Sequence, residues 1–474
     1  MAMIIILQDE HGNQIEKMEF DTNLTPEDWE ESLYQKGCKL ISKICVIALS
    51  IMEESLFHGH PQDWRVIGFR ERTLVTRFGD VTFNRRLYMD RKGEYHFLLD
   101  EYMDWKPSQL ATPSLTASLV RLSTEVPFRK VADTMADLIA GVLSRATIHR
   151  LLGRISEQAV EGEKAEYESS FQEGKLPEPG KKKASVVYTE ADGVWIHLQR
   201  EKQGDKKRKH YELKSAIAYD GWERLSQKEE RYRLTNKVVY CRSDDTIPLW
   251  DGVGLEWHKN WELSYTDAIV INGDGAKWID KGAGDLPDCV RQLDGFHLAR
   301  ACSRGWENGN DMYAAIRSGR ARQTLGELKE KEGKTAQKNR DYVLRHIDDG
   351  MDWRKKIEGT SLADAIPVDA RGLGCMESNE DKLFANRMKK RGMSWTIKGA
   401  QRMGKVIQLA FNGNLRDWCG RKFPESRKFR PSFDLFHGKG SSDIASLPAL
   451  ESSHASRPWA RALKDLTKPT YLLN

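Results

Sequence analysis

The sequence predicts a multidomain α/β protein, and three of its features support that class. The chain has 474 residues, which is enough for about three domains of ordinary size. Hydrophobic residues make up 39% and charged residues 31%, so apolar side chains are available for a core along the whole length. Segments with helical spacing and short β-rich segments also alternate, most clearly in the second half.

The N-terminal part predicts a helical arm followed by a small β domain. Residues 26–57 carry apolar side chains at helical spacing, so we expect a helical N-terminal arm over residues 1–60. Residues 61–111 contain three β-rich segments, and turn-forming residues separate them at Gly79-Asp80 and at Asp90–Gly93. This pattern predicts a small antiparallel β meander.

Residues 112–171 predict a helix-turn-helix region that binds DNA. Helical segments are expected at 113–122, at 127–139 and from Ser144 to about 159, and Ser144 is a suitable N-cap. The side chains near the start of the last helix that would reach base edges or phosphates are Arg145, Thr147, His149 and Arg150. The alternative is a helical spacer with solvated charges. Residues 172–183 are rich in Pro, Gly and charge, which predicts a linker.

Two aspartates lie at the ends of expected strands in the second half. Residues 184–191 read as a strand, and Asp192-Gly193 predicts a turn into a second strand at 194–199. A short apolar strand at 267–272 delivers Asp274 at its carboxyl end, followed by the start of a helix. Ligands of open α/β sheets gather at such strand ends.

A third acid follows after a long helical region. Residues 290–293 read as another short strand, and the chain is then strongly helical from about 298 to 366. Glu377 lies near the beginning of the next expected helix. The sequence therefore offers three acids at the edges of one α/β unit.

Asp192, Asp274 and Glu377 together suit phosphoryl transfer with two divalent metal ions. Hard carboxylate oxygens hold Mg²⁺ or Mn²⁺ without closing the coordination shell, so water and a scissile phosphate can complete it. Water as the nucleophile gives hydrolysis, and a DNA 3′-hydroxyl gives strand transfer. The chain has 70 acidic residues, however, and an aspartate in a turn more often serves turn geometry. Position alone does not select these three.

Four ordered motifs select them by resemblance. The motifs are Glu190-Ala-Asp192-Gly-Val-Trp-Ile-His-Leu-Gln199, Asn272-Gly-Asp274-Gly-Ala-Lys-Trp-Ile279, Leu293-Asp-Gly-Phe-His-Leu298, and Gly374-Cys-Met-Glu377 with Gly392-Met-Ser-Trp395. Together they resemble the bacterial insertion-sequence transposases of the ISLre-two family, in the Mutator-like group of Asp-Asp-Glu enzymes. Any one motif alone would be a weak signal.

The resemblance implies a ribonuclease H-like catalytic domain over residues 184–430, with an all-helical insertion at about 298–366. The spacing agrees with an insertion, because 82 residues separate the first two acids and 103 separate the second and third. The implied function is that of a DNA transposase, with two-metal cleavage and strand transfer at element ends. The implied partners are double-stranded DNA, as terminal inverted repeats and as target, and further copies of the chain in a homo-oligomer.

Several other residues are candidates for the same site. Glu380 lies three residues after the third acid on the same helical face, and is the alternative to it. Glu190 shares a strand face with the first acid, so we expect it to support that residue. By the resemblance, His297 and Arg300 are expected to contact a scissile phosphate or a flipped base. The alternative for His297 is a histidine that caps the core.

Basic residues gather in segments around the proposed acids. Residues 387–405 contain seven Lys or Arg and no acid, and the side chains expected to contact DNA there are Arg387, Lys389, Lys390, Arg391 and Trp395. Residues 200–214 add seven basic residues against three acidic ones, and residues 416–430 are also rich in Arg and Lys. Each segment alone is typical of a solvated face, but their clustering favours DNA.

Composition and missing motifs exclude several other classes. Seven scattered cysteines without a Cys-x-x-Cys pair predict free thiols, and no apolar segment reaches the length of a membrane span, so we expect a cytoplasmic protein. The sequence has no nucleophile elbow, phosphate-binding loop, dinucleotide fingerprint or His-Glu-x-x-His motif. Two alternatives remain, a non-catalytic DNA-binding protein derived from a transposase and a structure-specific nuclease on the same fold. Residues 431–474 predict a flexible C-terminal tail.

Overall fold

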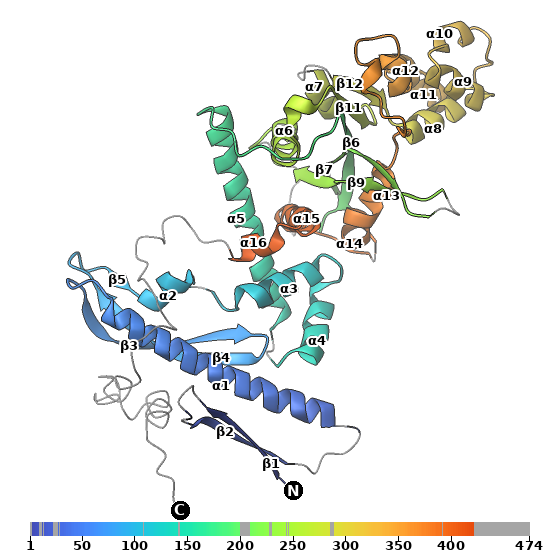
Figure 1. Ribbon diagram of the computed structural model, residues 1–474. Helices are drawn as coiled ribbons and strands as arrows, with labels where there is room; N and C mark the ends of the chain where they lie inside the picture. Colours follow the sequence, from blue (N-terminus) through green and yellow to red (C-terminus); the bar gives the residue numbers. More distant parts are fainter. Residues whose placement is uncertain are drawn as a thin grey trace, which may run out of the picture. The chain divides into compact units, whose positions relative to one another are not determined.

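A computed structural model describes residues 2–8, 12, 14–21, 27, 29–107, 109–140, 143–199, 209–226, 230–242, 244, 246–284, 289–390 and 392–420. The chain forms two compact units (Figure 1). One contains Met1–Leu119 and Phe128–His149, and the other contains Val120–Pro127 and Arg150–Trp418. The division falls within helix α5, and not at residues 172–183 where the sequence predicts the linker. The predicted tail lies outside the described residues.

The first unit begins with a β hairpin rather than with a helix. Strands β1 (Ala2–Gln8) and β2 (Gln14–Asp21) pair antiparallel, and helix α1 covers Trp29–His58. The prediction of a helical arm over residues 1–60 is therefore wrong for its first third. Three consecutive isoleucines, Ile4 to Ile6, favour the extended conformation because their branched side chains fit a strand better than a helix.

A three-stranded antiparallel sheet follows where the sequence predicts a meander. Strands β3 (Arg65–Thr76), β4 (Gly79–Met89) and β5 (Tyr95–His96) lie in the order β3-β4-β5, and helix α2 covers Leu98–Met103. Buried apolar side chains from this sheet pack against α1 and α2. The carboxylate of Asp100 accepts hydrogen bonds from the buried guanidinium groups of Arg72 and Arg85. The small sheet thus encloses a paired charge cluster.

Three helices follow within the region predicted as helix-turn-helix. They are α3 (Pro113–Ser123), α4 (Phe128–Leu138) and α5 (Arg145–Phe171). The amide of Thr147 donates to Oγ of Ser144 at 3.2 Å, so Ser144 caps α5 as expected. Helix α5 runs past residue 159, where the sequence predicts its end.

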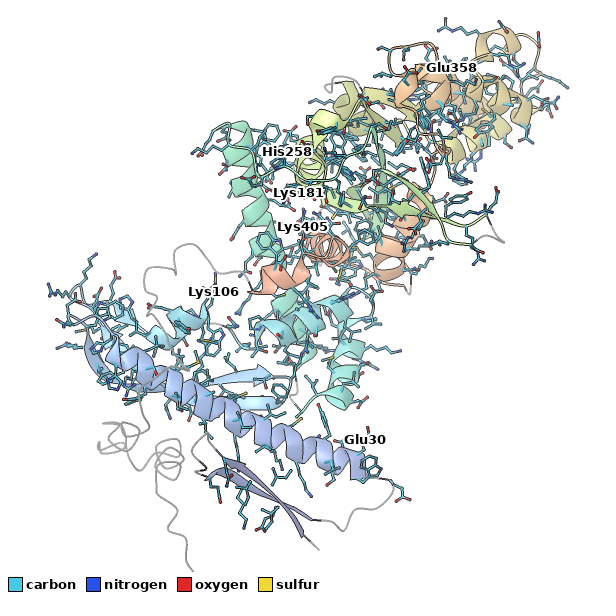
Figure 2. The ribbon with its side chains drawn as sticks, in the orientation of Figure 1. Glu30, Lys106, Lys181, His258, Glu358 and Lys405 are labelled. Atoms are coloured by element: carbon cyan, nitrogen blue, oxygen red, sulfur yellow. The ribbon has the colours of Figure 1, made fainter. Side chains whose placement is uncertain are left out.

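Residues 172–183 contain no helix or strand, and their second half packs against helix α6 (Leu249–Asn260). The amide of Gly180 donates to the carbonyl of His258 at 2.7 Å, and Nε2 of His258 (Figure 2) lies 2.9 Å from the carbonyl oxygen of Pro177. A Cβ atom at Gly180 would lie 2.1 Å from the backbone of Asn260, so only glycine fits there. This close packing explains why the segment does not separate two units.

The second unit is built on a five-stranded mixed sheet. Its strands are β6 (Val186–His197), β7 (His210–Tyr219), β10 (Val238–Arg242), β11 (Ala268–Gly273) and β12 (Cys289–Leu293). Their order is β10-β7-β6-β11-β12, with β6, β7 and β10 antiparallel to one another in turn and β6, β11 and β12 parallel. A separate hairpin is formed by β8 (Gly221–Arg224) and β9 (Tyr232–Thr235).

The turn predicted at Asp192-Gly193 is absent, because β6 continues straight through these two residues. Strand β7 pairs with β6 without interruption from Tyr188 opposite Tyr219 to His197 opposite His210. A Cβ atom at Gly193 would lie 2.3 Å from the carboxylate of Glu212, which accounts for glycine inside a strand. The sequence-based prediction of a turn is therefore wrong, because Gly193 is required by close packing and does not mark a turn.

Helices cover both faces of the sheet and one of its edges. Helix α6 and helix α7 (Lys277–Gly284) bury one face, with three tryptophans of the α6 region in its core. Helix α12 (Trp353–Ile357) and the chain after it bury part of the other face. Helix α15 (Ile397–Phe411) closes the free edge of β10, since Gln408 and Asn412 accept hydrogen bonds from the amides of Cys241 and Val239.

A buried ion pair joins α15 to α5 within the second unit. The Nζ atom of Lys405 (Figure 2) lies 2.7 Å and 2.9 Å from the two carboxylate oxygens of Glu163. Arg242 at the end of β10 lies 3.2 Å from the same carboxylate. The long α5 helix is therefore anchored at the edge of the sheet.

The predicted insertion is helical and has its own core. It contains α8 (Gly295–Gly305), α9 (Gly309–Arg317), α10 (Ala321–Thr324), α11 (Lys334–Arg345) and α12, with 3-10 turns at Leu263–Tyr265 before it and Ala363–Ala365 near its end. Figure 1 shows these helices gathered beyond the β12 edge. The chain then returns through α13 (Met376–Glu380), a π-helical segment (Asp381–Ala385), α14 (Asn386–Met388), α15 and α16 (Leu415–Gly420).

Candidate active site

Buried polar side chains form a row across the three parallel strands. Glu190 on β6, Asn272 on β11 and Gln292 on β12 are paired in register, and each is at most 1% exposed. Gln292 donates to Asn272 at 3.0 Å, and Asn272 donates to Glu190 at 3.0 Å. Residues two positions further along a strand point to the same face. The row therefore lies directly beneath the ends of these strands.

An aspartate follows each member of this row by two residues. Asp192 lies within β6, Asp274 follows the last residue of β11, and Asp294 follows the last residue of β12. A carboxylate oxygen of Asp274 accepts from the amide of Ala276 at 2.9 Å. Asp294 caps α8 by accepting from the amides of Phe296 and His297. The fold thus brings the first two predicted acids to one edge and adds Asp294.

The electrostatics of Asp192 show which charges surround it. The pKa of Asp192 is raised to about 7, mainly by burial; the negative charges of Asp274 and Glu380 add to the rise, whereas the Gly193 amide and His297 oppose it. Like charges this close destabilise one another's ionised forms. Asp192, Asp274, Glu380 and His297 therefore make up one electrostatic cluster.

Helix α13 presents Glu380, and not Glu377, to that cluster. The side chain of Glu380 is 13% exposed, whereas Glu377 is an exposed residue of the same helix. Met376 and Asn379 are buried, and Glu380 lies one helical turn after Met376, on the buried face. The sequence-based preference for Glu377 is thus reversed by the geometry. Helix α13 passes directly into the π-helical segment, a feature frequent at functional sites.

Glu190, which the sequence places on the same strand face as Asp192, makes several hydrogen bonds in the buried row. Its carboxylate accepts from the hydroxyl of Tyr219 at 2.7 Å and from the amides of Gly374 and Met376 at 3.1 Å and 3.2 Å. The thiol of Cys375 adds a contact of 2.8 Å. Burial raises the pKa of Glu190, and the hydrogen bonds from its neighbours oppose that shift.

His297 is held at the site by Asp294. Its Nδ1 lies 3.0 Å from Oδ1 of Asp294, and this hydrogen bond is the main reason that the pKa of His297 is raised. Burial pushes the pKa of Asp294 upward, but the hydrogen bonds from His297 outweigh it and the pKa is lowered. Arg300, three residues further along α8, is exposed. Both residues that the resemblance suggests thus lie on the helix that begins at this edge.

Two residues of the insertion that sequence reasoning missed fix the loop of Asp274. The hydroxyl of Tyr342 on α11 donates to the backbone carbonyl of Asp274 at 2.6 Å. Gly275 has φ +80°, and a Cβ atom there would lie 2.9 Å from the ring of His346. Tyr342 and His346 are four residues apart, one turn of the end of α11, which is the only signal that the sequence contains.

The proposed DNA-contacting residues of α5 differ in exposure. Arg145, His149 and Arg150 are exposed. Thr147 is only 8% exposed, and its hydroxyl lies 3.1 Å from that of Ser144. The prediction that Thr147 contacts DNA is therefore corrected, because its side chain belongs to the capped first turn of the helix.

The basic segment after α13 is largely committed to the protein itself. Arg387 is 2% exposed and donates to the carbonyl of Ser123 at 2.7 Å, and its guanidinium lies 5.1 Å from the centre of the Trp395 ring. Trp395 is 8% exposed, and its indole nitrogen donates to the carbonyl of Met388 at 3.0 Å. Both are structural residues, so their prediction as DNA contacts is wrong.

The neighbouring lysines form ion pairs with acids of the same region. Lys389 lies 3.2 Å from Glu380, and Lys390 lies 2.6 Å from Asp381. Arg391 lies outside the described residues, as do most of the basic positions in 200–214 and 416–430. The described part of the chain therefore offers fewer free cations near the acids than the sequence suggested.

The donor set of the cluster fits divalent metal ions. Asp192, Asp274 and Glu380 supply carboxylate oxygens, the ligands that Mg²⁺ and Mn²⁺ prefer. Burial is the main cause of the raised pKa of Asp192, and the charges of Asp274 and Glu380 add to it; a bound cation would offset that repulsion. The residues present thus supply the type of ligand atom that the expected cofactor requires.

Comparison with known proteins places the chain among uncharacterised proteins. A family model described as "Uncharacterised protein family (UPF0236)" matches residues 20–422. A "UPF0236 protein in vanSb 3'region" of Streptococcus gallolyticus is 25% identical over 383 residues, 77% of this chain and 78% of that protein. A UPF0236 protein of Caldanaerobacter subterraneus subsp. tengcongensis, whose name joins eleven locus designations, is 24% identical over 381 residues, 76% of this chain and 73% of that protein.

Similarity to solved structures is at a level too low to bear on the fold, as one example shows. It is the "Drosophila P element transposase strand transfer complex", with a TM-score of 0.22, 10% sequence identity, and coverage of 67% of this chain and 82% of that chain. Among the described helices, none is both long enough and apolar enough to cross a membrane.

Proposed function

This chain belongs to the uncharacterised protein family UPF0236, and we propose that it is a DNA transposase of the ISLre-two type, in the Mutator-like group. It would cut DNA at the ends of an insertion sequence and join those ends to target DNA. The observation that carries this proposal is that the charges of Asp274 and of Glu380 on α13 act on Asp192 at one edge of a mixed sheet, although 188 residues separate Asp192 from Glu380.

The sheet order supports the ribonuclease H-like core that we propose for residues 184–430. Three antiparallel strands are followed by two parallel ones on the other side of β6, in the order β10-β7-β6-β11-β12. Asp274 directly follows the carboxyl end of β11, Asp192 lies within the neighbouring strand β6, and Glu380 lies on a helix near the C-terminal end of the described unit. The helical insertion enters after β12, between the second and third acids.

The names of the relatives are a second support. One Caldanaerobacter name joins eleven locus designations, and another joins four. A single protein name shared by many loci of one genome is what copying of a mobile element would produce. This supports a role in the movement of DNA more than a housekeeping reaction.

The residues of the site would divide the work as follows. Asp192, Asp274 and Glu380 would hold the metal ions, and Glu377 is the alternative for the third position. Two bound Mg²⁺ or Mn²⁺ ions would supply activation of the attacking oxygen and stabilisation of the leaving oxygen. His297, oriented by Asp294, would donate a hydrogen bond to an oxygen of the scissile phosphate.

DNA would be bound through exposed basic residues, with Arg145, His149 and Arg150 on α5 and Arg300 on α8 as the candidates. A transposition reaction joins two element ends, so we propose that the chain acts as a homo-oligomer on DNA. Its place of action would be the bacterial cytoplasm, where the DNA is. A transposase-derived protein without chemistry would not need the three acids that the fold brings together.

The test is cleavage of labelled DNA from the boundaries of the chain's own genetic element. Wild type and Asp274→Asn are compared with Mg²⁺, and DNA binding is followed in parallel. Metal-dependent cleavage that is lost in the variant while binding is retained supports the proposal. Binding without cleavage in both proteins would contradict it. Cleavage without joining to a target duplex would identify a nuclease on the same fold.

A further inference from the structure

We propose that Glu190 is a positioning residue that fastens the start of α13 to the sheet and thereby places the acid of that helix beside Asp192 and Asp274. The inference rests on the two-metal function proposed above. It concerns how the third carboxylate arrives at the site. Its own observation is the set of contacts made by one fully buried carboxylate.

The contacts of Glu190 come from every element that must meet at the site. Tyr219 belongs to β7, Asn272 to β11, and Gly374, Cys375 and Met376 to the entry into α13. Oε2 accepts from three N–H groups, and Oε1 accepts from a hydroxyl and a thiol. All of these partners can donate, so the ionised carboxylate satisfies each of them at once.

Two of these donors are backbone amides at the beginning of α13. The first amides of a helix have no partner within the helix, and leaving such an amide without an acceptor destabilises the structure. Gly374 and Met376 find their acceptor only by lying against Glu190. This places the beginning of α13 relative to β6 within hydrogen-bonding tolerance.

The connection between β12 and α13 does not by itself fix the position of α13 relative to β6. More than 80 residues of insertion and return chain lie between β12 and α13, so chain connectivity leaves α13 free to move. One further described contact from the helix to the sheet is the hydrogen bond from Lys237 to Asn379, at 2.5 Å. Glu190 fixes the first residues of α13, and Glu380 is at its last.

Substitution by glutamine isolates the charge and the acceptor pattern. Glu190→Gln keeps the size but replaces one acceptor oxygen with an amino group that faces other donors. One of the two sets of partners, the α13 amides or Tyr219 and Cys375, then loses its acceptor. Residues that orient metal ligands typically change metal affinity or activity about 10- to 100-fold when substituted.

Local cutting of the protein backbone by bound iron shows which residues lie next to the metal ion, and it does not require DNA. Fe²⁺ at the Mg²⁺ position, with ascorbate and peroxide, cuts the chain next to its ligands. Wild type is expected to be cut near Asp192, near Asp274 and within 376–381, and excess Mg²⁺ should suppress all three cuts. In Glu190→Gln the cut within 376–381 should fall at least tenfold relative to the other two.

The control is Glu256→Gln, another buried glutamate, which is paired with Lys259 at 2.8 Å on α6. This variant should lose about as much stability as any protein from which a buried charge is removed. The three cuts should keep their wild-type ratio. Glu190→Asp, which keeps the charge and shortens the side chain, is measured as a second variant with the same expectation, because a glutamine can turn its oxygen toward the α13 amides.

The outcomes separate the two proposals. A wild-type ratio of cuts in both folded variants, Glu190→Gln and Glu190→Asp, overturns the positioning role and leaves the proposed function intact. Absence of any Mg²⁺-sensitive cut near Asp192 and Asp274 in wild type would instead contradict the proposed metal site itself. Selective loss of the α13 cut supports the inference.

Discussion

The Nζ atom of Lys389 lies 3.2 Å from Oε1 of Glu380, the acid of α13 that acts on the pKa of Asp192. A cation from the chain therefore already neutralises one of the carboxylates of the site. Lys389 competes for the same oxygen that a metal ion would use, so its charge adjusts how tightly the cluster attracts divalent cations.

Removal of this charge should strengthen metal binding. We expect Lys389→Met to lower the Mg²⁺ concentration for half-maximal binding by about two- to fivefold, since exposed pairs contribute about 0.2–1 kcal/mol. Lys390→Met is the matched control, because Lys390 pairs with Asp381 and not with an acid of the cluster. Isothermal titration with Mg²⁺ or Mn²⁺ measures both. Equal affinities for the two variants would show that Lys389 does not compete.

The two glutamates of α13 can be separated by a matched pair of substitutions. Glu380→Gln should abolish metal-dependent cleavage, because it removes a carboxylate that lies with Asp192. Glu377→Gln should retain most of the activity, because that side chain is exposed. Both proteins should bind DNA like wild type. The reverse pattern would assign the third position to Glu377, and would mean that α13 turns when metal binds.

The raised pKa of Asp192 predicts how metal-free protein responds to pH. In the unfolded chain an aspartate ionises near 3.9, whereas in the folded protein the pKa of Asp192 is about 7. Between these values the unfolded state loses a proton that the folded state keeps, so stability falls as the pH rises. Because asparagine does not ionise, Asp192→Asn should abolish this decrease in stability with rising pH.

Urea denaturation in the presence of a chelator measures the effect. We expect Asp192→Asn to be more stable than wild type at pH 8, with an advantage about 2 kcal/mol larger than at pH 5. Saturating Mg²⁺ should reverse the order, since only wild type has the ligand. A constant difference between the two proteins at every pH would refute the assigned pKa.

Much of this site could be predicted, and the failures have separate physical reasons. The strands β11 and β12, the position of Asp274 after β11 and the position of Glu190 on the strand face of Asp192 follow from alternation and strand ends. The turn at Asp192-Gly193 does not form, because Gly193 serves close packing against Glu212. Glu377 and Glu380 are three residues apart, so periodicity cannot tell which one faces the sheet.

Contacts between segments far apart in the sequence account for the residues whose roles the sequence did not predict. Tyr342 reaches the backbone of Asp274 across 68 residues, and Arg387 reaches Ser123 across 264. No local pattern reports such docking. A run of basic residues looks the same in the sequence whether its members are free or, like Lys389 and Arg387, engaged by their own protein.

The hydrogen bond from Tyr342 should contribute to the order of the Asp274 loop. Tyr342→Phe keeps the ring and removes the hydroxyl, which should destabilise the unit by about 1 kcal/mol and weaken metal binding. Gly275→Ala should lower stability and metal affinity further, because alanine would have to adopt a left-handed backbone conformation and its Cβ atom would lie 2.9 Å from His346. Thermal denaturation and metal titration check both. A Tyr342→Phe protein with unchanged metal affinity would limit the insertion to a structural role.

DNA binding should depend on α5. We expect Arg145→Ala to weaken binding and to lower the slope of the logarithm of affinity against the logarithm of salt concentration by about one unit. Thr147→Val is the control, because Thr147 is buried and should leave both quantities unchanged. Filter binding at several salt concentrations provides the measurement. An unchanged slope for Arg145→Ala would remove this helix from the DNA interface.

The hydrogen bond between Glu190 and the amide of Met376 spans 186 residues, and this sets when the site can exist. A ribosome that adds about 5–20 residues per second needs roughly 10–40 seconds to make the intervening chain. During that time the first strand has emerged without the acid that completes the site. Under the proposed function, a chain that ends before α13 would therefore be unable to cut DNA, and cutting would begin only after residues 376–380 have been made.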